Sequence, residues 1–166
     1  MKAVSNTTPL RYLIAIEQEH LLGQLFEKVF VPVAVHEELT DSRTPETVRR
    51  RVLALPAWFE VSYGARISEN QVSRHLAPGR TGSHLLAETL HADVLLIDEQ
   101  IGRTIALSRN LQLSGTLGAL ERADRMGFVS DFQQVLQRLR ASGFFITEAL
   151  EQQLLERHRT RRGRSL

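Results

Sequence analysis

Two short apolar runs in this chain each end at a polar residue that could do chemistry. Val4-Ser5 is followed by Asn6, and Val94–Ile97 is followed by Asp98 and Glu99. Both runs then pass into a helical pattern, and in a parallel sheet the carboxyl ends of the strands gather ligand sites at one edge. A carboxylate at that edge is placed to bind a metal ion or to act as a general base. The first run supplies an amide instead, and this difference limits the strength of any metal site.

Strand-like runs alternate with helical patterns along the chain, and these elements must position the polar residues. Val94–Ile97 is apolar at every position, as expected of a central strand covered on both faces. The alternation predicts an α/β fold with a mostly parallel central sheet and helices on both faces. Pro78-Gly79 is expected to break the chain, and Thr44 to cap a helix. We expect strands at 3–5, 29–31, 59–61, 94–97 and 111–114, and helices at 10–16, 19–26, 34–39, 44–55, 68–76, 81–90, 101–107, 117–125, 132–140 and 147–158.

The length of 166 residues suits one domain with a substantial core. The chain contains no cysteine, which excludes disulfides and thiolate zinc sites. No run approaches the roughly 20 apolar residues of a membrane span. The strand-like start at residue 3 does not have the profile of a signal peptide. We therefore expect a soluble, cytoplasmic protein with no membrane contact.

The net charge of +2 is unevenly distributed. Residues 157–166 contain five arginines and no acid, which leaves 16 basic against 19 acidic side chains in the rest of the chain. We expect a single domain over 1–156, with a C-terminal helical pair at about 131–156, and a basic tail over 157–166. The tail could contact phosphates or be a frayed, solvated end. The helical pair could complete the domain or form a dimer contact.

Several motifs occur in a fixed order along nearly the whole chain. They are Val4–Leu10, Val31-Pro32 with Glu37–Leu39, Val94–Glu99 with Gly102-Arg103, Ser114–Gly118 and Gly143–Ile146. This ordered set resembles the PIN-domain proteins, specifically a prokaryotic subgroup with an extended C-terminal helical region. The resemblance implies a PIN-like three-layer fold and a Mg²⁺- or Mn²⁺-dependent ribonuclease, related to the toxins of toxin–antitoxin pairs. RNA, an antitoxin-like protein and a second copy in a homodimer are then the expected partners.

The resemblance also implies a cluster of about four acidic residues that hold the metal, because Mg²⁺ prefers oxygen ligands. Glu38 matches the helix glutamate, Asp98 matches the strand-end aspartate, and Asn6 occupies the first acidic position. Where the subgroup shows Gly-Glu-x-Glu, this chain has Gly79-Arg80-Thr81-Gly82, so both acids are missing. We expect Asp98, Glu38 and Asn6 to be the metal ligands and catalytic residues of a weakened acidic site. The alternative is a non-catalytic PIN-like module that binds a protein partner or RNA.

Each of these residues also has a structural interpretation. Asp98 could cap the helix that begins at Glu99, and Glu38 could be a solvated helix residue. Asn6 could be a turn residue that bonds to the nearby backbone. Glu99 and Arg103 are four residues apart, so they could form a surface ion pair. The resemblance makes Arg103 and Arg80 candidate phosphate contacts.

Two further sets of residues offer weaker metal ligands. His84, Glu88 and His91 recur at helical spacing, but His-x-x-x-Glu without a third ligand equally suits a solvated helix face. If the motif at 78–83 is aligned differently, Glu69 or Glu88 could supply a third acid. Neither set changes the prediction that Asp98 and Glu38 are the main carboxylates.

Overall fold

The computed structural model describes residues 1–54, 56–63 and 78–163, with the side chains of 78–81, 162 and 163 excepted. Five parallel strands form one sheet in the order β3-β2-β1-β4-β5. The strands are β1 (Lys2–Ser5), β2 (Lys28–Pro32), β3 (Phe59–Ser62), β4 (Val94–Leu96) and β5 (Leu113–Ser114). The helices are α1 (Thr7–Ala15), α2 (His20–Leu25), α3 (Val33–Thr40), α4 (Glu46–Leu53), α5 (Pro78–Thr89), α6 (Gln100–Ser108), α7 (Thr116–Arg125), α8 (Phe132–Ala141) and α9 (Glu148–Gly163). The predicted α/β fold with a parallel sheet is confirmed.

Alternate residues of the central strands face two separate cores. Ala3 and Leu96 belong to the larger core, whereas Val4 and Leu95 belong to a smaller one that includes residues of α5 and α6. This alternation follows from the two-residue period of a strand. The sheet is therefore covered on both faces, and its carboxyl edge stays open for polar residues.

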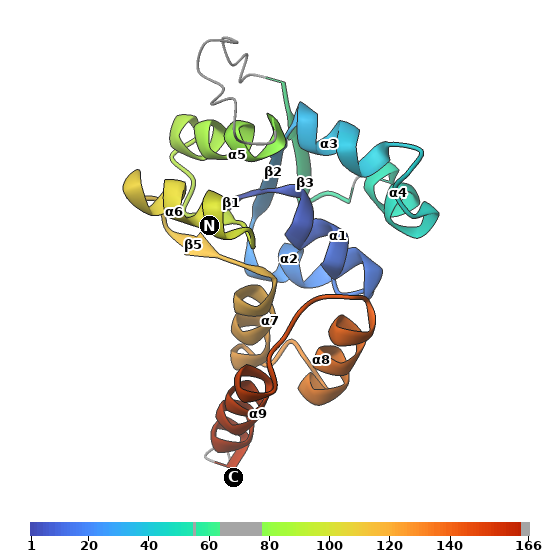
Figure 1. Ribbon diagram of the computed structural model, residues 1–166, viewed down its shortest axis with the longest axis vertical. Coiled ribbons are helices and arrows are strands. Elements are labelled where there is room, and N and C mark those ends of the chain that lie inside the picture. The colour runs from blue at the N-terminus through green and yellow to red at the C-terminus, as the bar shows by residue number, and fades with distance from the viewer. Residues whose placement is uncertain (55, 64–77, 164–166) are drawn as a thin grey trace.

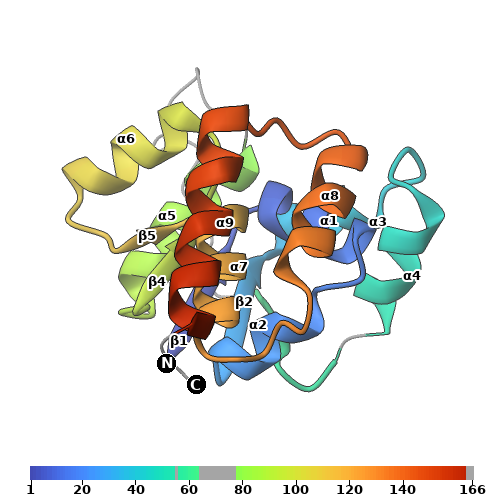
Figure 2. The same cartoon turned by 90° about the horizontal axis from the view of Figure 1, so that it is seen from below.

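The C-terminal helices pack on the domain itself. The larger core includes four of their residues, Phe132, Leu136, Leu139 and Leu154. Figure 1 shows α7, α8 and α9 together below the sheet, and Figure 2 shows them side by side. The helical pair thus packs on the larger core. Homodimerisation stays a prediction, and a dimer would need a surface other than these buried faces.

Three local predictions need correction. Helix α5 begins at Pro78, where we expected a break, because proline is well tolerated at the first helical position. Thr44 does not cap α4, because its hydroxyl donates to the carbonyl oxygen of Glu38 at 2.8 Å. Residues 157–163 are helical rather than frayed, since α9 continues to Gly163. The predicted helix at 68–76 lies outside the described residues.

Among the described residues, no helix has the length and apolar character needed to cross a membrane.

Candidate functional site

The ends of three neighbouring strands bring the predicted residues to one edge of the sheet. Asn6 follows β1 and Asp98 lies just beyond β4, and these strands pair with Ser5 opposite Leu96. The backbone N–H of Asn6 donates to the carbonyl oxygen of Leu96 at 2.9 Å. Thr116 lies just beyond β5, the next strand in the sheet. Thr116 was not among the predicted site residues, although the same strand-end rule applied to 111–114 would have indicated it.

Asp98 is held by Thr116. Its Oδ1 accepts the backbone N–H of Thr116 at 2.8 Å, and its Oδ2 accepts the Thr116 hydroxyl at 2.6 Å. Gly115 is the N-cap residue of α7 and has no side chain, so Asp98 supplies the capping oxygen from another part of the chain. The expectation that Asp98 caps the following helix is therefore wrong. That helix, α6, has Glu99 at its N-cap position and no side-chain cap bond.

Asn6 uses both ends of its amide. Its Oδ1 accepts the backbone N–H of Thr7 at 2.8 Å, which is the local bonding expected of a turn residue. Its Nδ2 donates to Glu99 Oε2 at 3.1 Å, and the Thr8 hydroxyl donates to Glu99 Oε1. An aspartate at position 6 would place a second carboxylate against Glu99 in place of this donor. The amide of Asn6 thus matches the acid beside it.

Glu38 joins this edge through a hydroxyl. The Thr7 hydroxyl donates to Glu38 Oε2 at 2.6 Å, while the rest of the glutamate side chain is exposed. Glu38 also borders a groove of about 650 Å³, whose charged lining includes Arg11, Glu37, Asp41 and Arg43. The structure therefore brings Asn6, Glu38 and Asp98 to the same end of the sheet, each bonded to a threonine.

Of the two predicted cationic contacts, the structure describes the side chain of Arg103. Arg103 Nη1 donates to the carbonyl oxygen of Ile97 at 3.0 Å. No ion pair between Arg103 and Glu99 occurs in the described part of the chain, because Glu99 instead accepts from Asn6 and Thr8. The side chain of Arg80 lies outside the described residues.

The weaker candidates do not join the site. His84 is buried, with Nε2 2.8 Å from the carbonyl oxygen of Gly102. Glu88 binds Arg109 at 2.9 and 3.0 Å. His91 is exposed in the turn that follows α5, and Glu69 lies outside the described residues.

The position of Asp98 affects its ionisation. Burial raises the pKa of the Asp98 carboxyl above its ordinary value of 3.8, and the hydrogen bonds from Thr116 oppose this change. The neighbouring charge of Glu99 also raises this pKa, and the Arg103 guanidinium lowers it. The net direction is upward, so the folded protein holds a proton on Asp98 more tightly than the unfolded chain does.

The raised pKa of Asp98 makes the stability of the protein depend on pH. The stabilisation that protonated Asp98 contributes to the free energy of unfolding is fully present below pH 3.8 and is lost as the pH rises through the raised pKa of the folded state. We expect the free energy of unfolding of the wild type, relative to that of Asp98→Asn, to fall as the pH rises through this window. Urea unfolding of both proteins at closely spaced pH values measures the difference. A difference that rises with pH, or stays flat, would contradict the prediction.

The described residues at this edge supply fewer acids than the metal centre that the resemblance implies. Each oxygen of Asp98 and of Glu99 accepts one hydrogen bond from the chain itself, and each keeps a second acceptor site. The oxygen of Asn6 accepts a backbone N–H, and its nitrogen, which cannot act as a ligand for a hard cation, faces Glu99. Within residues 1–54, 56–63 and 78–163, no group of three or more histidine, aspartate or glutamate side chains could hold a metal ion.

Comparison with known proteins agrees with the fold. A family model described as a PIN domain matches residues 2–160, nearly the whole chain. Proteins of this family typically bind divalent metals. The comparison with curated proteins finds no match.

Proposed function

Because this chain belongs to the PIN-domain family, we propose that it is a PIN-domain binding module that engages a partner protein without cleaving RNA. One observation carries the proposal: donors of the chain itself bind every carboxylate at the described sheet edge. Thr116 donates to both oxygens of Asp98, Thr8 and Asn6 donate to Glu99, and Thr7 donates to one oxygen of Glu38.

The charge around the site favours a partner with basic residues. The groove beside Glu38 is lined by three acids and two arginines, and one of the arginines, Arg43, is already paired with Asp41 at 2.8 Å. Outside residues 157–166, acidic side chains outnumber basic ones by 19 to 16. A local excess of carboxylates attracts a basic peptide segment and repels phosphates. An antitoxin-like protein with a basic segment is therefore the partner we propose, ahead of RNA.

A metal-dependent ribonuclease, with a toxin-like role, is the second candidate. It is favoured by the position of Asn6, Glu38 and Asp98 at the same end of the sheet, with Glu99 beside them. In that case Asp98, Glu38 and Asn6 would be the ligands of Mg²⁺ or Mn²⁺, and Arg103 and Arg80 the contacts to RNA phosphates. The toxin role would be tested by comparing the growth of cells that express the wild type with the growth of cells that express Asp98→Asn.

Metal titration separates the two candidates. We expect no saturable Mn²⁺ binding by the wild type in calorimetry at moderate salt. The loss of a carboxylate should weaken metal binding, because two opposite unit charges 4 Å apart attract each other by about 4 kcal/mol at an effective dielectric of 20. The variant Asn6→Asp/Arg80→Glu restores two acids and should gain measurable binding that Asp98→Asn removes again. Micromolar Mn²⁺ binding by the wild type, with Mn²⁺-dependent RNA cleavage lost in Asp98→Asn, would overturn the proposed function.

A further inference from the structure

A second cavity lies away from the sheet edge, between α1, α4 and the segment that leads into β3. Its volume is about 200 Å³. Most of its lining is apolar and comes from Leu10, Ile14, Val52, Pro56, Trp58 and Phe59. Among the described residues, its polar lining consists of Glu19, His20 and Arg51. An apolar cavity with a few polar groups is the usual form of a small-molecule site.

Glu19 is the unusual residue in this cavity. It is 8% exposed, and its Oε1 lies 3.3 Å from Arg51 Nη1. Its Oε2 is shielded from solvent and accepts no hydrogen bond from any residue in the described part of the chain. Leaving a buried carboxylate oxygen without a donor is costly, and native proteins rarely do so without a reason. A donor supplied by a ligand would remove that cost.

The residues around Glu19 indicate which kind of donor a ligand would supply to its Oε2. Arg51 is largely exposed, with 59% of its side chain accessible, so solvent screens its charge and it satisfies only one oxygen. An ammonium carries three donors and forms charge-assisted hydrogen bonds with a carboxylate, which are stronger than neutral ones. The aromatic and aliphatic walls favour an apolar body behind that ammonium.

The aromatic wall is held in place by packing. A Cβ added at Gly23 of α2 would lie 2.3 Å from Trp58 Cδ1, so the indole packs directly on the glycine. Trp58 also makes an edge contact with Phe59, with ring centroids 6.0 Å apart. The cavity wall is therefore fixed before any ligand arrives, which lowers the entropic cost of binding.

We propose that this cavity binds a small primary amine with an apolar body, its ammonium on the Glu19 carboxylate and its body against Trp58. The site is separate from the sheet edge and does not depend on the partner proposed above. Arylalkyl amines are the chemical class that fits these walls.

The single tryptophan provides a direct readout, because all fluorescence excited at 295 nm comes from Trp58. We expect 2-phenylethylamine to change this emission saturably. Two probes with the same skeleton, 3-phenylpropionate and 2-phenylethanol, should bind at least about tenfold more weakly because they lack the cation. Equal binding of the three probes, or no saturable change with the amine, would overturn the proposal.

Matched variants test the roles of the carboxylate and the cavity. Glu19→Gln keeps the shape of the side chain and should weaken amine binding at least about tenfold. Glu27→Gln, at an exposed glutamate outside the cavity, should leave binding unchanged. Ala54 is an exposed lining residue, so Ala54→Phe adds a bulky ring at the rim while Glu19 itself is kept, and it should abolish binding even if Glu19→Gln fails to fold. Unchanged affinity in Glu19→Gln or in Ala54→Phe would contradict the site.

Discussion

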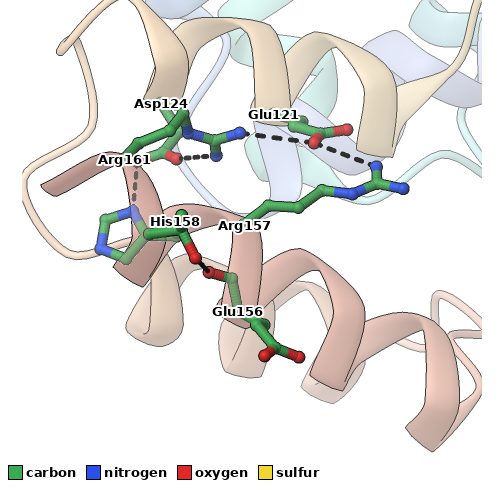
Figure 3. Close-up of polar contacts among 7 residues, drawn as sticks. Glu121, Asp124, Glu156, Arg157, His158 and Arg161 are labelled. Atoms are coloured by element: carbon green, nitrogen blue, oxygen red, sulfur yellow. Dashed lines mark hydrogen bonds and ion pairs between the residues drawn. The ribbon is translucent and has the colours of Figure 1, made fainter. Parts of the chain in front are cut away.

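Replacing Asp124 with alanine is expected to lower the free energy of unfolding by about 3 kcal/mol, because it removes the acid of a buried ion pair and leaves the basic partner without this counter-charge. The Asp124 side chain is 3% exposed and lies between α7 and α9. Its Oδ1 is 2.7 Å from His158 Nδ1, and its Oδ2 accepts from Arg161 Nη2 at 2.6 Å (Figure 3). Without Asp124, the Arg161 guanidinium would lose this short contact, and its ion pair with Glu121 is longer, at 3.6 Å.

The loss should be greatest where α9 contacts α7. His158 also stacks on Phe132, with ring centroids 5.5 Å apart, so the aspartate fixes an aromatic contact in addition to a charge. Urea unfolding measures the stability, and hydrogen exchange of the α9 amides shows whether this helix opens first.

Glu156→Ala is the matched control for Asp124→Ala. Glu156 is an exposed acid of α9, the helix that Asp124 holds from α7, and no ion pair of its side chain is found among the described residues (Figure 3). Its removal should change stability by less than about 0.5 kcal/mol. Equal effects of the two substitutions would show that α9 is not held by Asp124.

Replacing Gly115 with alanine is expected to destabilise the fold by about 1–3 kcal/mol, through overpacking at the sheet edge. A Cβ at this position would lie 2.5 Å from Asp98 Oδ1 and 3.4 Å from Arg103 Nη1. The backbone of Gly115 is extended, with φ −127°, so the effect is steric and does not come from backbone strain. Asp98 would have to move, and it would then lose one or both bonds to Thr116.

A double-mutant cycle tests this mechanism. In the Asp98→Ala background the obstructing carboxylate is gone, so Gly115→Ala should cost much less there, and the two substitutions should be coupled. Gly118→Ala, within α7, is the control, because its Cβ would meet the rotatable Ser114 hydroxyl at 2.6 Å and otherwise the Ser114 Cβ at an ordinary 3.8 Å. Its cost should be small, since alanine favours the helix interior by about 1 kcal/mol over glycine. Additive effects of Gly115→Ala and Asp98→Ala would show that the clash does not involve Asp98.

The strands, and the central position of one of them, could be predicted from local patterns. The uniformly apolar run 94–97 indicated a central strand, and β4 indeed lies between β1 and β5. The strand-end rule placed Asn6 and Asp98 at one edge of the sheet, and the structure brings them there. Pro78 was misinterpreted because proline marks both a chain break and a helix start, and sequence alone does not separate the two.

The bonding partners at the site could not be predicted in the same way. Asp98 caps a helix that begins 18 residues later, because the packing of β5 beside β4 brings Thr116 to it. The basic end of the chain was expected to be a tail, but Arg157 and Arg161 bind Glu121 of α7 and α9 continues to Gly163. Neither result follows from spacing along the chain.

The sequence by itself determined the α/β alternation, the polar residues at the strand ends and the missing acids at positions 80 and 82, because these depend on residue type and local period. Only the tertiary structure decided which donor satisfies each carboxylate. A hydrogen bond requires two atoms within about 3 Å of each other, and for Asp98, Glu99 and Asp124 the partners come from segments 18 to 93 residues away.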